Sequence, residues 1–333
     1  MTKKVLTIGG AVRDLFLEYD NPFTLTHAGR NYIAFEEGRK LEVTNLLSYV
    51  GGGAANAAVS FTRLNHDTQA FFKVGNDPDG DYIMRILQQQ GINTKSAVIS
   101  KTVQTGISCI VPTPSGNRTV LVYRGAAATL QEDEIPYTAI ENCDQLYVTS
   151  LSDASSLQLL PIVVHAQKYK KSVAVNPGGS QLRSGVEVLR KALPSIDIFI
   201  LNTVEAQQFM RGFTQATFSV SAYCNAIVAQ GPHTVVVTDG AHGVYVAHEN
   251  TLYFYPSLLV KVVSSVGAGD AFGSTFVALR VDGKSIEDAL IGGIINASSV
   301  ISDVGSQTGL MTLTEIEKRL SSADRTLLQV HAL

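Results

Sequence analysis

The sequence predicts an α/β protein built around a doubly wound, mainly parallel sheet with helices on both faces. From Gln145 onward, short apolar runs rich in β-branched residues alternate with longer segments of helical period, the pattern of βαβ units. The run 196–201 is almost entirely apolar, which suits a central strand covered on both sides. The 333 residues, of which 45% are hydrophobic, suffice for a large core. We therefore expect a single domain over residues 1–333 with a small appendage.

The elements of this sheet are predicted one by one from local patterns. The N-terminal run 5–8 is short and apolar and precedes Gly9 and Gly10, so we interpret it as a first strand. Further strands are expected at residues 146–149, 173–175, 196–201 and 235–238. Crossover helices are expected at residues 155–169, 185–193, 203–211 and 219–229.

Two segments, near residues 15–50 and 106–124, depart from this alternation of strands and helices. The second contains two strand-like runs on either side of a turn-forming stretch, which predicts a β-hairpin. The strands expected in the two segments are residues 32–35, 41–43, 107–111 and 119–123. We expect them to pair into a small sheet, which serves either as a lid over a site or as a structural flap, and we favour the lid.

Charge and composition limit the classes of partner. Lys and Arg number 26 against 29 Asp and Glu, a net charge of −3, so no basic surface for nucleic acid is expected. No apolar stretch approaches the roughly 20 residues of a membrane-spanning helix, and the N-terminus does not read as a signal peptide. Cys109, Cys143 and Cys224 have neither disulfide nor zinc spacing. We therefore expect a cytoplasmic protein that acts on a small molecule.

The strongest local signal is the run 262–273, in which a strand ends, a turn of small residues follows and a helix begins near Asp270. Gly267, Ala268 and Gly269 let the backbone approach a ligand, and a helix N-terminus presents free N–H groups to an anion. Asp270 beside such an anion hole can accept the proton of an attacking hydroxyl. The same spacing also fits an aspartate that caps the helix, so both interpretations stay open at this point.

Glycines also precede a second predicted helix. Gly51, Gly52 and Gly53 lead into an alanine-rich segment in which Asn56 projects from the first turns, well placed to bind a polar ligand. The alanines themselves are better explained by close packing of the helix on the sheet. No Walker A sequence occurs, and the dinucleotide-binding pattern of three glycines is incomplete both here and before Asp270, which disfavours a nicotinamide-dependent oxidoreductase.

Five short motifs follow one another along nearly the whole chain. They are residues 51–56, 74–80, 202–205, 238–240 and 267–270. In this order and spacing, ending on Gly-Ala-Gly-Asp, the sequence resembles the PfkB (ribokinase-like) carbohydrate kinases. Each motif alone is weak, but the five together are specific. The resemblance implies a ribokinase-like fold and an ATP-dependent kinase.

The resemblance also implies roles for residues on the acceptor side of the site. Asp270 would be the catalytic base, and the backbone of Gly267, Ala268 and Gly269 would form the anion hole. Substrate hydroxyls would be bound by an aspartate near the end of the first strand and by the early glycine cluster: Asp14, Gly52, Gly53 and Asn56.

On the nucleotide side, the resemblance implies that Asn202, Thr238, Gly240 and Asn296 contact ATP. Glu205 would serve the region of the Mg²⁺ ion. The spacing of Asn202 and Glu205 at a strand-to-helix junction also fits a helix-capping box, so a purely structural role is the alternative for this pair.

Departures from the family pattern bear on the substrate. Ribokinases carry an asparagine and a lysine where this chain has Val12 and Gly53, so ribose is not the expected acceptor. Ala127 replaces a further asparagine, which removes one sugar contact. Ser264 stands at the position of an acidic residue that contributes to a monovalent-cation site in the family, and we therefore expect weak dependence on potassium.

We expect transfer of the γ-phosphoryl group of MgATP to a hydroxyl of a sugar or sugar-like molecule. The main alternative is a nucleoside kinase of the same fold, in which a base would stack on aromatic residues near the lid: Phe16, Tyr32, Phe35 and Tyr123. A non-catalytic ligand-binding relative is a further alternative, which the complete Gly-Ala-Gly-Asp motif disfavours. An apolar lid face would favour a homodimer.

Overall fold

A nine-stranded sheet forms the centre of the protein. The structure, a computed structural model, describes residues 2–19, 23–113, 118–210 and 219–333. The central sheet has the order β17-β16-β15-β14-β13-β12-β11-β1-β6 and is parallel from β14 to β6. Its strands are β1 (Lys4–Ile8), β6 (Asp67–Phe71), β11 (Gln145–Val148), β12 (Ser172–Val175), β13 (Ile198–Asn202), β14 (Thr234–Thr238), β15 (Val244–His248), β16 (Thr251–Tyr255) and β17 (Gln329–Ala332). The predicted fold class is confirmed.

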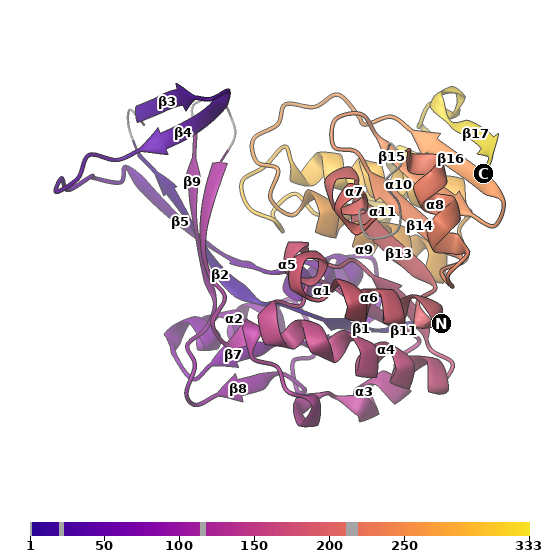
Figure 1. The fold of residues 1–333 in the computed structure, drawn as a ribbon, viewed down its shortest axis with the longest axis horizontal. Coiled ribbons are helices and arrows are strands. Elements are labelled where there is room, and N and C mark those ends of the chain that lie inside the picture. The colour runs from indigo at the N-terminus through magenta and orange to yellow at the C-terminus, as the bar shows by residue number, and fades with distance from the viewer. Residues whose placement is uncertain (1, 20–22, 114–117, 211–218) are drawn as a thin grey trace.

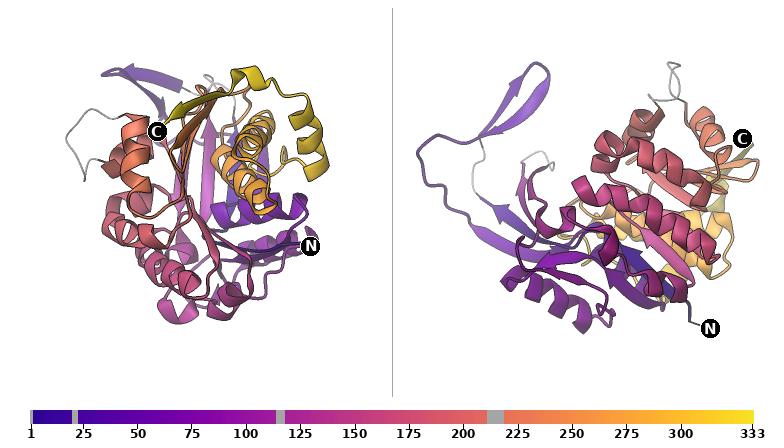
Figure 2. Two further views of the ribbon diagram at one scale, coloured as in Figure 1. Left: turned by 90° about the vertical axis from the view of Figure 1, so that its right-hand side faces the viewer. Right: turned by 60° about the horizontal axis from the view of Figure 1, so that its bottom comes forward.

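Helices cover both faces of the sheet because consecutive strand residues point to opposite sides (Figures 1 and 2). In β13, Phe199 and Leu201 pack into one core and Ile198 and Ile200 into the other. The first core is completed by α3 (Tyr137–Asn142), α4 (Leu159–Lys168), α6 (Val186–Ala192), α7 (Thr203–Met210) and α8 (Val220–Val228). The second is completed by α1 (Gly53–Arg63), α9 (Ala268–Val281), α10 (Ile286–Val300) and α11 (Leu313–Ser321).

Beyond β6 the chain adds a smaller third core. It contains α2 (Pro78–Gln89) and lies beside the short parallel pair β7 (Lys73–Gly75) and β8 (Val98–Ser100). The remaining helix, α5 (Gly179–Ser184), follows β12. In the described residues no helix is long and apolar enough to cross a membrane.

A second sheet of four strands stands beside the main body (Figure 1). It has the order β10-β9-β2-β5 and consists of β2 (Val12–Glu18), β5 (Asn45–Gly51), β9 (Ile107–Pro112) and β10 (Arg118–Tyr123). The hairpin β9–β10 is antiparallel, and β9 runs parallel to β2. The two departing segments thus pair into one sheet; the predicted turn between β9 and β10 falls outside the described residues.

The path between β2 and β5 differs from the prediction. Residues 32–34 of the predicted strand 32–35 belong to β4 (Arg30–Ala34), which pairs with β3 (Phe23–His27) in a separate two-stranded sheet. Residues 41–43 form no strand, and their predicted strand is wrong; the strand that joins the four-stranded sheet is β5. Leu41 and Val43 are about half exposed, so they lack the pleated neighbours against which strand residues pack.

Candidate active site

The N-terminus of α9 has the geometry of an anion-binding site. Gly267 is the N-cap and has φ 81°, a left-handed conformation that favours glycine. A Cβ on Gly267 would lie 2.5 Å from the Cβ of Ser306, so the residue also needs its small size. A Cβ on Gly269 would meet no atom within 4 Å, so the first turn faces open space. Its backbone N–H groups, which have no partner inside the helix, are accessible to an anion.

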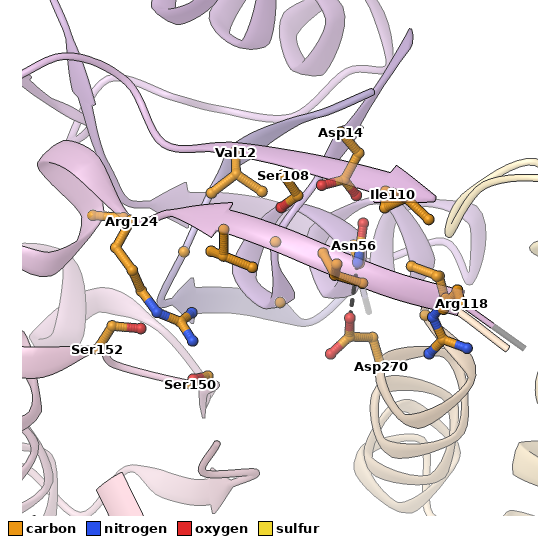
Figure 3. A pocket seen from close by; sticks show the side chains of 18 residues that line it. Val12, Asp14, Asn56, Ser108, Ile110, Arg118, Arg124, Ser150, Ser152 and Asp270 are labelled. Carbon is orange, nitrogen blue, oxygen red and sulfur yellow. Dashed lines mark hydrogen bonds between the residues drawn. The ribbon is translucent and has the colours of Figure 1, made fainter. Parts of the chain in front are cut away.

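Asp270 is not the cap of this helix. It lies at the third helical position, and no side-chain hydrogen bond caps α9. Its carboxylate instead accepts a hydrogen bond of 2.8 Å from Nδ2 of Asn56, which lies 214 residues away along the chain (Figure 3). Burial raises the pKa of Asp270, and the hydrogen bond from Asn56 lowers it. The geometry therefore removes the capping interpretation and leaves an oriented carboxylate at the anion site.

Hydrogen bonds fix both the oxygen and the nitrogen of the Asn56 side-chain amide. Asn56 is 4% exposed, and its Oδ1 accepts hydrogen bonds of 2.8 Å from Ser306 Oγ and 3.0 Å from Gln307 Nε2. These two donors fix the orientation of the amide, so its NH₂ group points at Asp270. Asn56 also lines the cavity described next, as predicted, but its principal contact is with the carboxylate of Asp270.

Asp14 lies on β2, in the four-stranded sheet. The sequence placed it near the end of the first strand; the structure corrects this, because the chain turns at Gly9 and Gly10 and enters a second strand at Val12. The Asp14 side chain packs on the bare backbone of Gly51, where a Cβ would lie 1.9 Å from Oδ2. Burial, opposed by a hydrogen bond with Ser108 and reinforced by the charge of Asp270, raises the pKa of Asp14 to about 6.

A cavity of about 260 Å³ lies between the four-stranded sheet and the main body. Asp14 and Asp270 both line it, together with Asn56, Gly52 and Gly53. Its wall on the sheet side includes alternate residues of β10 and the residue after it, namely Arg118, Val120, Val122 and Arg124. Figure 3 shows Arg118 and Arg124 toward opposite ends of this wall. We call this cavity the acceptor cavity.

A second cavity, of about 290 Å³, shares Gly53, Ser150, Gly267 and Asp270 with the acceptor cavity. Asn202 and Glu205 line it, and they do form a capping box: Asn202 N donates to Glu205 Oε2 at 3.0 Å, and Glu205 N donates to Asn202 Oδ1 at 2.9 Å. Burial raises the pKa of Glu205, against hydrogen bonds with Asn202. Asn202 and Glu205 therefore cap the helix and also line a polar cavity. We call this the phosphate cavity.

A third cavity, of about 350 Å³, is mainly apolar and adjoins the phosphate cavity through Thr238 and Gly269. Gly240 and Phe272 also line it. Asn296 does not: it is fully buried, donates to Thr275 Oγ1 at 2.7 Å and accepts from Met311 N at 2.9 Å. The structure therefore brings Thr238 and Gly240 to this cavity and leaves Asn296 in the core between α9 and α10. We call this the nucleotide cavity.

Sequence reasoning missed several residues of the site. Arg118 and Arg124 were overlooked although the predicted strand 119–123 carries the signal, since residues on one side of a strand recur every second position. Ser306 and Gln307, which hold Asn56, have no such local signal. The four aromatic residues proposed as a platform for a nucleoside base are absent from the acceptor cavity as described. Tyr32 and Phe35 lie about half exposed near β4, away from this wall.

The fold and the site together define a small-molecule kinase: a carboxylate stands at a helix N-terminus between a polar acceptor cavity and a phosphate cavity. The chain belongs to the pfkB family of carbohydrate kinases, whose family model matches residues 4–313. It is therefore a carbohydrate phosphotransferase.

Individual relatives are distant but match over most of their length. A ribokinase of Staphylococcus aureus is 26% identical over 96% of this chain and 100% of its own. A 5-dehydro-2-deoxygluconokinase of Bacillus subtilis is 26% identical over 91% of this chain and 97% of its own. The structure of the Arabidopsis thaliana ribokinase complexed with ribose and ATP covers 96% of this chain and 99% of its own, with a TM-score of 0.79 at 20% identity. This structural likeness shows the shared fold.

Proposed function

We propose that the protein transfers the γ-phosphoryl group of ATP to a hydroxyl of a sugar-like molecule, with Asp270 as the catalytic base. One observation supports this most directly. The three cavities adjoin one another in a row, and Asp270 lies on the boundary between the acceptor cavity and the phosphate cavity. A hydroxyl held on one side and a phosphoryl group held on the other would meet at this carboxylate.

The acceptor would be bound chiefly by Asp14. Asp14 is 6% exposed, and its carboxylate accepts hydrogen bonds, the complement of a sugar hydroxyl. Gly52 and Gly53 lack side chains, so a small substrate can approach the backbone at the start of α1. The acceptor cavity, a little smaller than the roughly 300 Å³ at which ligand pockets begin, suits a molecule of sugar size.

Asp270 would take the proton of the attacking hydroxyl as the new oxygen–phosphorus bond forms. Asn56 orients this carboxylate, and its hydrogen bond opposes the burial that raises the pKa of Asp270. The N–H groups at the start of α9 would stabilise the negative charge on the transferred group, near Gly267, Ala268 and Gly269. The four-stranded sheet would act as the lid that limits water at the reacting atoms.

ATP would extend from the phosphate cavity into the nucleotide cavity. Asn202 and Thr238 would contact its phosphates, and Gly240 lines the apolar space that suits an adenine ring. Glu205 and the amide oxygen of Asn202 supply oxygen donors of the type Mg²⁺ prefers. Mg²⁺ would neutralise phosphate charge. The ribokinase complexed with ribose and ATP, which shares this fold, supports the assignment.

The test is a screen for ADP release with MgATP and a panel of sugars, sugar derivatives and nucleosides, followed by Asp270→Asn. Asparagine keeps the size of the side chain but cannot accept the proton, so kcat should fall by about 10²–10⁴-fold while the melting temperature and ATP affinity hold. Asp81→Asn, an exposed aspartate in the first turn of α2, is the matched control and should keep its activity. A folded Asp270→Asn protein with the wild-type kcat would refute the assignment of the base.

A further inference from the structure

We propose that the acceptor carries an anionic group, a carboxylate or a phosphate, which Arg124 binds at the end of the acceptor cavity away from Asp270. This inference rests on the proposed function and names the substrate class of the same site. It follows from the position of Arg124, from its lack of an internal partner and from the hydroxyls beside it.

Arg124 enters the cavity as part of the lid wall. The residue follows directly after β10, and alternation along this strand directs Arg124 to the same side as Val120 and Val122. Figure 3 shows its guanidinium on the side of Ser150 and Ser152, with Asp270 and Arg118 toward the opposite end. A group bound by Arg124 is therefore separated from the reacting hydroxyl by the middle of the substrate.

The charge of Arg124 has no counterion in the described parts of the chain. Neither an ion pair nor a hydrogen bond joins its guanidinium to a described residue. Arg118 differs, because it donates a hydrogen bond to Ser265 Oγ. The side chains around the middle of the wall, Val12, Val120 and Val122, are apolar and do not compete for Arg124. Arg124 itself is exposed, so its guanidinium is accessible to an anionic ligand that enters the cavity.

Two hydroxyls lie on the same side as Arg124. Ser150 and Ser152 line the acceptor cavity, Ser150 lines the phosphate cavity as well, and Ser152 is 6% exposed. Across the described residues neither hydroxyl is engaged in a hydrogen bond with the protein. A guanidinium and two hydroxyl donors can together bind the oxygens of one carboxylate or phosphate, and charged hydrogen bonds of this kind are the strong ones.

Arg124 is assigned to the acceptor rather than to ATP. Arg124 and Ser152 line the acceptor cavity and do not line the phosphate cavity, whereas Ser150 lines both. Asp14 would then bind hydroxyls and Arg124 an anionic group, two chemically different parts of one acceptor molecule. A polyhydroxylated acid or a sugar phosphate has both parts.

The experiment compares matched acceptors in the ADP-release assay. The anionic acceptors are aldonic acids, keto acids derived from them, and sugar phosphates. The neutral acceptors for comparison are the corresponding sugars and alditols. We expect the wild type to prefer an anionic acceptor, and the arm with the higher kcat/KM identifies carboxylate or phosphate. In Arg124→Met the ratio of kcat/KM for that acceptor to kcat/KM for its neutral counterpart should fall about 10- to 100-fold.

Control variants and the possible outcomes separate this inference from the proposed function. Arg124→Lys should recover part of the ratio, since it keeps the charge and loses the planar fork, whereas Arg39→Met, at an exposed ion pair with Glu36, should leave the ratio unchanged. A wild-type preference for neutral acceptors, or an equal loss for both acceptors in Arg124→Met, would overturn the inference while leaving the kinase assignment intact. No ADP release with any acceptor would instead refute the proposed function.

Discussion

Asp14→Asn should stabilise the protein at neutral pH while weakening acceptor binding. Burial, together with the nearby charge of Asp270 and against the Ser108 hydrogen bond, raises the pKa of Asp14 from 3.8 to about 6. Because the folded state has the higher pKa, it binds more protons in this window, and the free energy of unfolding falls as pH rises from about 4 to about 6. Two pKa units at about 1.36 kcal/mol each correspond to about 3 kcal/mol lost at pH 8.

Denaturant unfolding of wild type and Asp14→Asn at pH 4 and pH 8 measures this effect. The neutral asparagine avoids the burial of a charge, so the variant should gain up to about 3 kcal/mol at pH 8 and little at pH 4. Its acceptor KM should rise strongly and its ATP KM should change little, because Asp14 lines only the acceptor cavity among the three. A variant that is equally or less stable at pH 8 would refute the reasoning.

Two further predictions concern the proposed base, Asp270, and Ser264, which lies just before the glycine turn that precedes it. Asn56→Ala removes the hydrogen bond that lowers the pKa of Asp270, so the acidic limb of the pH profile of kcat/KM should move to higher pH. On that limb kcat/KM should fall about tenfold. A fall in kcat/KM that is the same at every pH would contradict this prediction. Replacing sodium by potassium at constant ionic strength should change the rate little, since Ser264 carries no charge; a large rise would count against it.

The main sheet could be predicted because its signals are local. The strands from β11 to β14 are buried and apolar on both faces, so each is visible as a short run of hydrophobic residues. The anion-binding start of α9 was also visible, since its glycines and Asp270 are adjacent in sequence. Both features depend on neighbours within a few residues of one another.

The rest of the site depends on contacts between distant segments. Asn56 was assigned to the substrate because nothing near it in the sequence reveals Asp270, Ser306 or Gln307 as its partners. Asp14 was assigned to the wrong strand, since Gly9 and Gly10 only bend the chain before a second strand begins. Asn296 was placed on a ligand because a polar side chain within a helix gives no indication of its bonds to Thr275 and Met311.

Alternation along β10 gives this strand of the four-stranded sheet two separable sets of positions. Residues 118, 120, 122 and 124 line the acceptor cavity, while Leu121 and Tyr123, both about half exposed, point away from it. A single mutagenic oligonucleotide covering codons 118–124 therefore reaches every residue that this segment contributes to the acceptor cavity. A library confined to the four even positions would search for new acceptors while keeping α9, its glycines and the phosphate cavity as a constant catalytic module.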